Sequence, residues 1–348
     1  MSVAAHHEGS PLRSRLTVGS RLAAAGGSTV GFDYLRLSLA LAVALFHIPV
    51  FTYGSWGTSV VLEGPLRPLL MTILPMFFAA GGFLVAASLE RCNTMAAFVG
   101  LRMLRLMPAL AMATLFTAFV VGPALSELSL ADYFKHPEFR NFFLNLFGAV
   151  QYKLPGLFTS NPIPYLVNSP LWTLPYDLLC YGGLALLGLT NLKRRPWLVP
   201  LVALGSSVTF LIVHLDDPQA TSAVIGYRRG FFLVQSFLWG VSVYLFRERV
   251  PLGGTLLGIA AAVAALAVFA EGMFSYLGPP SLAYLAISIG LRNPPTLPRL
   301  KADLSYGLYL YHAIIFQALM HIAPAHWVLT AAIGLPTAFG LAALSWFV

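Results

Sequence analysis

The sequence predicts an all-α integral membrane protein, a bundle of about ten transmembrane helices with both termini in the cytoplasm. Hydrophobic residues make up 58% of the 348 residues and charged residues only 10%, whereas a soluble domain is about a quarter charged. The mean hydropathy is +0.77. So few charges could not cover the surface of a soluble fold of this size, and we therefore expect most of the surface to face lipid.

Ten apolar stretches approach the ~20 residues that a membrane helix needs. The eighth contains Pro279 and Pro280, which predicts a bend or a later start. The predicted spans are 34–52, 68–89, 105–122, 171–190, 197–213, 229–246, 252–270, 274–291, 304–321 and 328–348.

The basic residues fix the predicted orientation of these spans. If the N-terminus is cytoplasmic, most of the 21 Lys+Arg fall in cytoplasmic segments, as the positive-inside rule requires. This bias favours an even number of helices. We expect the protein to lie in the cell inner membrane. We divide the chain into a disordered cytoplasmic N-terminus over residues 1–30, which are polar, and one transmembrane domain over residues 31–348.

The formal charge of +8 has two interpretations. It reflects membrane topology, or it marks a site for an anionic ligand. No basic segment alternates with aromatic residues in a soluble context, so nucleic acid is not an expected partner. The two cysteines, Cys92 and Cys180, have no metal-ligand spacing, and we expect no metal and no permanently bound cofactor.

Residues 123–170 form a long predicted connection on the outer face, rich in aromatic residues and proline. A connection of this length in a compact protein is usually functional or disordered. Its apolar run 142–150 is too short to span a membrane, so it is expected to lie in the interface or to re-enter the bundle.

Polar residues inside a bilayer are costly and therefore point to function. In the first span, Arg36 and His47 lie on one helix face, separated by ~16 Å along the axis. Asp33 precedes Arg36 by almost one turn. His47 could accept a proton from a hydroxyl group near neutral pH. The alternative is a buried histidine that is hydrogen-bonded to a neighbouring carbonyl.

Two further groups have the same ambiguity. Arg102 and Arg105 share a helix face at the cytoplasmic start of the third span, where two guanidinium groups suit a phosphate-bearing ligand but also fit the positive-inside rule. In the fourth span, Asp177 needs a partner such as Arg or His. Trp172 is expected at the outer membrane interface, where aromatic residues are common.

A polar stripe marks the ninth span. Ser305, Tyr309 and His312 share a face at positions i, i+4 and i+7. Stripes of this kind often only hydrogen-bond neighbouring helices, so the stripe alone does not assign a function.

Five segments are informative in combination and order. They are FDYLRLSLALAVALFH, MFFAAGGFLVAAS, FVGLRMLRLMP, NSPLWTLPYDLLCY and LSYGLYLYH. Together they resemble motifs of the membrane-bound acyltransferase family 3, and the resemblance runs from about residue 31 to the end of the sequence. Gly81 stands where the family usually has Ser, and Asp177 where Glu is common.

The resemblance implies transfer of an acyl group, often acetyl, from acyl-CoA to a hydroxyl of a carbohydrate or glycoside acceptor, with surface polysaccharide or lipid-linked glycan as the leading class. We assign His47, Arg36 and Asp177 to catalysis, with His47 as general base or acyl carrier. Arg102 and Arg105 are assigned to the donor phosphates. The substrate-binding candidates are Asp33, Trp172, Tyr309 and His312.

Two other functions remain open from the sequence. A secondary transporter exporting a sugar or lipid-linked substrate would use the buried Arg, His and Asp residues as a proton relay, although no internal repeat supports it. A non-catalytic membrane scaffold would not depend on His47.

Overall fold

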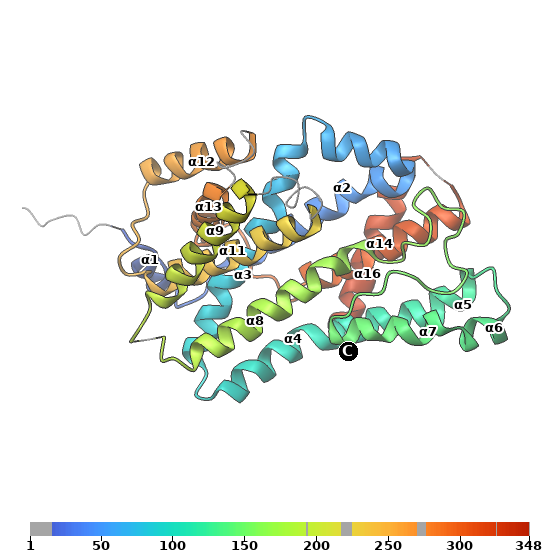
Figure 1. Ribbon diagram of the computed structural model, residues 1–348, viewed down its shortest axis with the longest axis horizontal. Helices are drawn as coiled ribbons and strands as arrows, with labels where there is room; N and C mark the ends of the chain where they lie inside the picture. Colours follow the sequence, from blue (N-terminus) through green and yellow to red (C-terminus); the bar gives the residue numbers. More distant parts are fainter. Residues whose placement is uncertain (1–15, 193, 217–224, 270–275, 325, 348) are drawn as a thin grey trace, which may run out of the picture.

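A computed structural model describes residues 16–192, 194–216, 225–269, 276–324 and 326–347. In these ranges the protein consists of helices and their connections, with one isolated β-bridge between Thr17 and Pro251. Figure 1 shows how these helices are arranged. The predicted all-α class is therefore confirmed for the described part of the chain.

Each predicted span coincides with helical structure. The central elements are α2 (Val30–Glu63), α3 (Arg67–Arg91), α4 (Met95–Phe116), α8 (Leu174–Gly188), α9 (Leu198–Asp216), α11 (Ile225–Leu245), α12 (Gly254–Phe269), α13 (Gly278–Gly290), α14 (Ser305–Ile322) and α16 (Leu335–Trp346). The shorter elements are α1 (Val18–Ala24), the π-helix Thr117–Val121, α5 (Gly122–Leu125), α6 (Leu130–Lys135), α7 (Pro137–Phe142), the 3₁₀ helices Phe143–Phe147 and Ser169–Thr173, α15 (Trp327–Leu329) and the π-helix Thr330–Gly334.

Four helical segments in the described residues are long and apolar enough to cross a membrane. They are Val30–Glu63, Arg67–Arg91, Met95–Leu125 and Trp327–Trp346. These segments support a protein that crosses the membrane several times. The count of ten membrane helices and the cytoplasmic position of both termini stay predictions.

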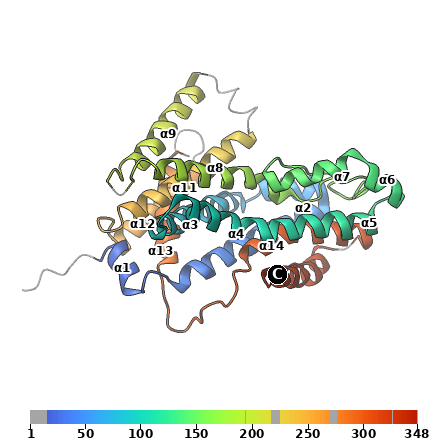
Figure 2. The same ribbon diagram turned by 90° about the horizontal axis from the view of Figure 1, so that it is seen from below.

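The core forms where α3 packs along α11 and where α2 packs along α14 (Figures 1 and 2). Glycine allows the closest approach of α3 and α11. A Cβ atom on Gly82 would lie 2.1 Å from the carbonyl oxygen of Phe237, and one on Gly240 would lie 2.1 Å from that of Ala79. Small residues at such crossings let two helix backbones touch, which is a common basis of helix association in membranes.

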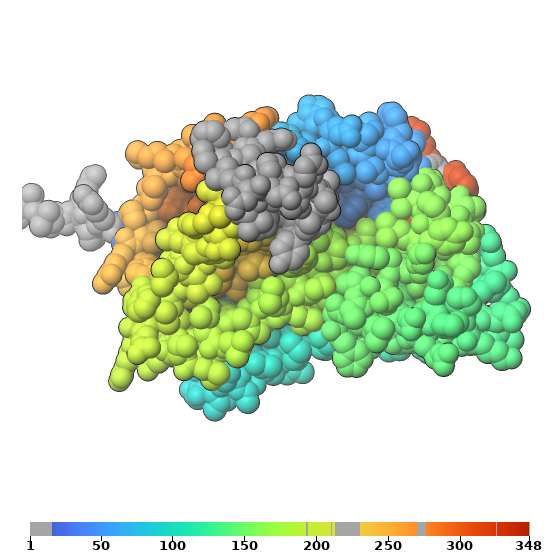
Figure 3. Space-filling model, viewed as in Figure 1, coloured from blue at the N-terminus to red at the C-terminus, as the bar shows by residue number. Residues whose placement is uncertain are grey.

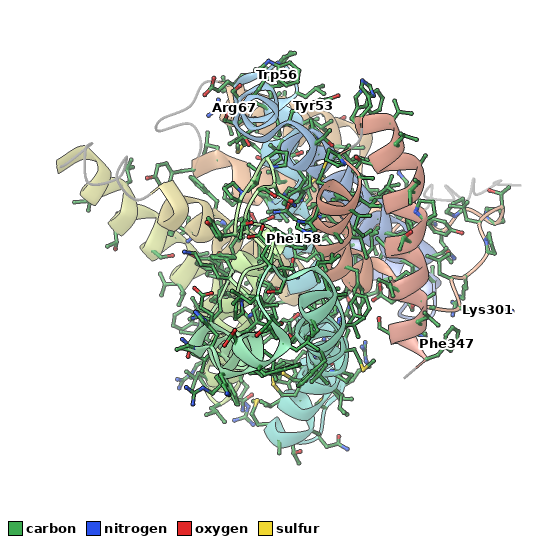
Figure 4. The ribbon with its side chains drawn as sticks, turned by 90° about the vertical axis from the view of Figure 1, so that its right-hand side faces the viewer. Tyr53, Trp56, Arg67, Phe158, Lys301 and Phe347 are labelled. Atoms are coloured by element: carbon green, nitrogen blue, oxygen red, sulfur yellow. The ribbon has the colours of Figure 1, made fainter. Side chains whose placement is uncertain are left out.

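Helix α2 is longer than its predicted span because it continues past a break at Gly54. Gly54 has φ 62°, a left-handed conformation that glycine adopts without steric cost. A Cβ atom there would also lie 2.5 Å from the carbonyl oxygen of Pro162. Beside the break, Tyr53 and Trp56 form an edge-to-face pair, and both are labelled at the top of Figure 4.

The predicted connection 123–170 is an ordered part of the bundle. It forms short helices and then a segment that crosses α14; its green surface covers one end of the molecule in Figure 3. The buried Gln317 amide donates to the carbonyl oxygens of Ile163 and Leu166 at 2.8 and 2.6 Å, and its oxygen accepts from Asn161 at 2.7 Å. Phe158 is fully buried among the helices (Figure 4).

The N-terminal segment departs from the predicted disorder over residues 1–30. Residues 1–15 lie outside the described ranges, but Val18–Ala24 form α1, which Thr17 starts with a capping box. Val18 is fully buried, and its N–H donates to the carbonyl oxygen of Val250 at 3.0 Å. The packed part of the chain therefore begins earlier than the polar composition suggested.

We expect Gln317→Leu to destabilise the protein. The substitution removes the donor to the carbonyl oxygens of Ile163 and Leu166 and one of the two acceptors of the Asn161 amide. Each group left unsatisfied costs about 1–3 kcal/mol. A lower melting temperature in detergent and faster proteolysis within 148–168 would show the loss. Gln151→Leu is the matched control, because that side chain makes only a 3.5 Å exposed hydrogen bond; equal effects of the two substitutions would contradict the role of Gln317.

Candidate active site

Two histidines from different helices meet inside the bundle. Nδ1 of His47 on α2 lies 2.9 Å from Nε2 of His312 on α14, and the ring centroids are 5.0 Å apart. His312 is fully buried, and its Nδ1 lies 2.9 Å from the carbonyl oxygen of Leu308. Phe51 and Phe316 pack around the pair. The structure thus brings together the sequence candidates His47 and His312.

The hydrogen bonds of this pair determine where its protons lie. A carbonyl oxygen only accepts, so Nδ1 of His312 carries a hydrogen. In the neutral ring, Nε2 of His312 is then an acceptor, and Nδ1 of His47 must donate to it. The second nitrogen of His47, Nε2, is consequently unprotonated, and it has no hydrogen-bond partner among the described residues.

A charged cluster lies at the other end of the contact between α2 and α14. Nη1 of Arg36 lies 2.6 Å from Oδ2 of Asp303, and Nη2 donates to Oγ of Ser305 at 2.9 Å. Arg105 on α4 binds the same carboxylate oxygen at 3.0 Å. Asp303 therefore joins two arginines from different helices, and we call Arg36, Arg105 and Asp303 the arginine cluster.

The environment of Asp303 changes its pKa in two directions. Burial raises the pKa of this carboxyl group, but the charges of Arg36 and Arg105 and the hydrogen bond from Ser305 outweigh that effect. The net result is a pKa below the ordinary value of 3.8. The carboxylate is therefore ionised at neutral pH.

The second predicted arginine has a different partner. Arg102 donates to Oγ of Ser88 on α3 at 3.2 Å, while its Nε is buried with no hydrogen-bond partner among the described residues. The predicted pairing of Arg102 with Arg105 is thus only partly seen. Arg102 and Arg105 lie on one face of α4. Arg105 binds the carboxylate of Asp303 together with Arg36, whereas Arg102 does not.

A small cavity of about 30 Å³ lies between the arginine cluster and the histidine pair. Asp177 on α8, Phe77 on α3 and Tyr309 on α14 line it. The Phe77 ring lies 5.7 Å from the Arg36 guanidinium and 6.5 Å from the Tyr309 ring. The Tyr309 ring is in turn 6.1 Å from His312. These contacts connect the two polar groups through the bundle interior.

Asp177 does not have the predicted partner. It forms no ion pair with Arg or His in the described part of the chain, because Asp303 occupies that place beside Arg36 and Arg105. Asp177 instead lines the cavity. The hydroxyl group of Tyr306, also in the cavity wall, is buried and has no partner among the described residues.

The remaining candidates lie at different distances from this site. Tyr309 lies within it, and its hydroxyl group is 3.0 Å from that of Thr173. Trp172 stacks edge-to-face on Tyr176 at 5.9 Å instead of contacting the histidine pair. Asp33 is exposed at the start of α2, ~21 Å along the helix axis from His47.

Sequence reasoning missed Asp303 and Ser88. Asp303 lies outside the predicted spans, so its charge drew no attention. A usable signal was its position two residues before Ser305, because Asp is typical of helix starts. Its side chain does accept from the Ser305 N–H at 3.3 Å and from the Ser305 hydroxyl at 2.6 Å.

We expect Asp303→Asn to lower the free energy of unfolding by about 2–3 kcal/mol at pH 7, because it leaves two arginines without their anion. The folded-state pKa is depressed, so the contribution is present above about pH 3.8 and is lost as the pH falls through the lower folded-state pKa. Denaturation of both proteins in detergent across pH would test this. Glu138→Gln is the surface control; a difference between Asp303→Asn and wild type that is independent of pH would contradict the ion pairing.

Comparison with known proteins shows the family to which the chain belongs. Residues 29–347 match the family model described as an acyltransferase domain. The chain is 26% identical to an O-acetyl transferase of Shigella phage Sf6, over 83% of this chain and 85% of that protein. It is 28% identical to Nodulation protein 10 of Rhizobium leguminosarum bv. viciae, over 92% of each chain.

No solved structure matches significantly. The family model nevertheless covers almost the whole chain and includes both the histidine pair and the arginine cluster. The protein therefore belongs to the acyltransferase family 3 and is an acyltransferase.

Proposed function

We propose that the protein transfers an acyl group, in the first place acetyl, from cytoplasmic acyl-CoA to a hydroxyl of a carbohydrate or glycoside at the cell inner membrane. Surface polysaccharide or lipid-linked glycan is the leading acceptor class. The observation that carries the proposal is the unprotonated Nε2 of His47, which the contact with His312 leaves available. The name of the phage relative, O-acetyl transferase, supports acetyl as the acyl group.

In the proposed reaction, Nε2 of His47 accepts the proton of the acceptor hydroxyl as its oxygen attacks the thioester carbonyl carbon. The new C–O bond replaces the C–S bond. The CoA thiolate takes the proton from His47 and leaves as the thiol. While His47 is an imidazolium ion, its Nδ1–H still donates to His312, which stabilises the charge. His312 thus has the orienting role that a third group has in catalytic triads.

A covalent route uses the same nitrogen. Nε2 of His47 would first take the acyl group from the thioester and then pass it to the acceptor hydroxyl. Both routes require the His47 tautomer that His312 fixes. They differ in whether an acyl-imidazole forms without an acceptor, which a rapid-quench experiment with donor alone would reveal.

We assign the donor phosphates to the arginine cluster and Arg102. A guanidinium group can donate two hydrogen bonds to the oxygens of one phosphate. The buried Nε of Arg102 still lacks a partner among the described residues. A phosphate group would compete with the carboxylate of Asp303 for Arg36 and Arg105. Asp177 would then accept hydrogen bonds from the donor inside the bundle.

The pantetheine arm would pass from the arginine cluster to His47 through the cavity lined by Phe77, Asp177 and Tyr309. A volume of about 30 Å³ accommodates little more than water, so donor binding requires these side chains to move apart. The acceptor would arrive from the other end, beside the segment 148–168 that crosses α14. Trp172 and Asp33 then lie away from the reacting atoms.

The transporter and the scaffold receive no specific support from the structure. The buried Arg36 is ion-paired with Asp303 instead of continuing a chain of titratable groups toward His47. The family match and the named O-acetyl transferase relative both indicate an enzyme.

We expect His47→Ala to abolish acyl transfer, with a loss of at least ~10² in kcat, because it removes the base. Membranes that contain equal amounts of each variant would be given labelled acetyl-CoA and a panel of glycan and glycoside acceptors. His136→Ala, at a partly exposed histidine, is the control and should transfer label like the wild type. Label transfer that survives in His47→Ala would disprove the assignment.

His312 offers a sharper test of the tautomer. In His312→Gln, the amide oxygen can still accept from Nδ1 of His47, so we expect kcat within ~10-fold of wild type. His312→Leu cannot accept and should lose ~10² or more in kcat with little change in KM for acetyl-CoA, because His312 does not contact the donor. Equal activity of the Gln and Leu variants would exclude the orienting role.

A further inference from the structure

A second and larger cavity lies apart from the candidate active site. It has a volume of about 290 Å³ and is bounded by α1, α13 and the start of α12. It lies at the same end of the bundle as the start of α2, because the carbonyl oxygen of Arg292, in its wall, accepts from the N–H of Gly31 at 3.1 Å. The proposed acyl transfer does not use this cavity.

The cavity is lined by two arginines and by no carboxylate. Arg21 comes from α1, and Arg292 follows α13. Neither forms an ion pair within the described part of the chain, unlike Arg36, Arg105 and Arg247, which each contact a carboxylate. Nε of Arg21 donates to the carbonyl oxygen of Leu291 at 3.4 Å, which holds the guanidinium group at the cavity wall.

A polar group without a partner lies in the same wall. The hydroxyl oxygen of Ser288 on α13 is buried and has no hydrogen-bond partner among the described residues. A buried hydroxyl usually finds a partner, and an anion in the cavity would accept its hydrogen. Gly254, the first residue of the 16-residue helix α12, also lines the cavity, and helix N-termini favour negative charge.

Apart from Tyr284, whose hydroxyl group donates to the carbonyl oxygen of Pro251, the rest of the wall consists of leucine and glycine. Leu252 and Leu257 line the cavity, so its occupant needs apolar groups next to its negative charge. Farther along α12, Ile259, Leu266 and Phe269 are 55%, 47% and 70% exposed. This exposed surface gives hydrocarbon chains a continuous path away from the cavity.

We propose that this cavity binds the phosphodiester headgroup of an anionic phospholipid from the cytoplasmic leaflet. The phosphate lies between the guanidinium groups of Arg21 and Arg292 and accepts from the Ser288 hydroxyl, while the acyl chains follow α12. Phosphate esters also occur in soluble nucleotides, but the leucine wall and the apolar face of α12 favour the lipid. A bound lipid would join α1, α12 and α13.

The test is lipid binding to the purified full chain in a neutral detergent, followed by native mass spectrometry. The probes are phosphatidylglycerol and phosphatidylcholine with identical chains. We expect wild type to prefer phosphatidylglycerol, and Arg21→Gln/Arg292→Gln to lose ~10-fold or more of that affinity. Arg194→Gln/Arg195→Gln removes the same charge from another surface and should change the affinity by less than ~2-fold.

Ser288→Ala separates this site from general surface charge, because it keeps every arginine. We expect a several-fold loss of phosphatidylglycerol affinity with the same melting temperature in lipid-free detergent. Unchanged affinity in both Ser288→Ala and the Arg21/Arg292 variant would overturn the proposal. Displacement of the lipid by millimolar inorganic phosphate or adenosine 3′,5′-bisphosphate would instead assign the cavity to a soluble phosphate ester, and equal losses in the Arg194/Arg195 control would reduce it to surface charge.

Discussion

The contact between α2 and α14 is the interaction on which the rest of the site depends. Polar side chains join the two helices at both ends of this contact. Arg36 binds Asp303 and Ser305 at one end, and His47 is hydrogen-bonded to His312 at the other; we call these two sets of interactions the polar junctions. Polar groups are costly in an apolar bundle unless they are paired, so each junction restricts the sliding and rotation of one helix on the other. The same two junctions place the groups that we propose to bind phosphate and to accept the proton at a fixed separation. Stability and chemistry therefore rest on one helix contact.

Much of this arrangement could be read from the sequence. Each apolar stretch became a helix, because bilayer-length apolar runs have few other ways to satisfy their backbone. Helical spacing placed Arg36 and His47 on one face and Ser305, Tyr309 and His312 on another, and the structure shows that these two faces meet. Helix periodicity shows which residues share a face, but not which neighbouring helix that face contacts.

The misses follow from that limit. Asp177 is a charged residue within a span and so was expected to have an Arg or His partner, but Asp303, outside any span, pairs with Arg36 and Arg105. The position of residues 161–166 depends on hydrogen bonds with Gln317, about 150 residues further along the chain. At the break in α2, the carbonyl oxygen of Pro162 likewise leaves no room for a side chain on Gly54. Such long-range pairings leave no local pattern in the sequence.

The carboxylate of Asp303 has a consequence for turnover. In the proposed mechanism, a donor phosphate replaces one anion with another, so Arg36 and Arg105 stay neutralised whether the site is full or empty. The donor binds less tightly because it must displace the Asp303 carboxylate from the two arginines. After the reaction, the same carboxylate competes with free CoA for these arginines at a high effective concentration, because it belongs to the same chain. An internal counterion of this kind trades affinity for rapid product exchange, which suits an enzyme whose donor and product carry the same phosphate groups.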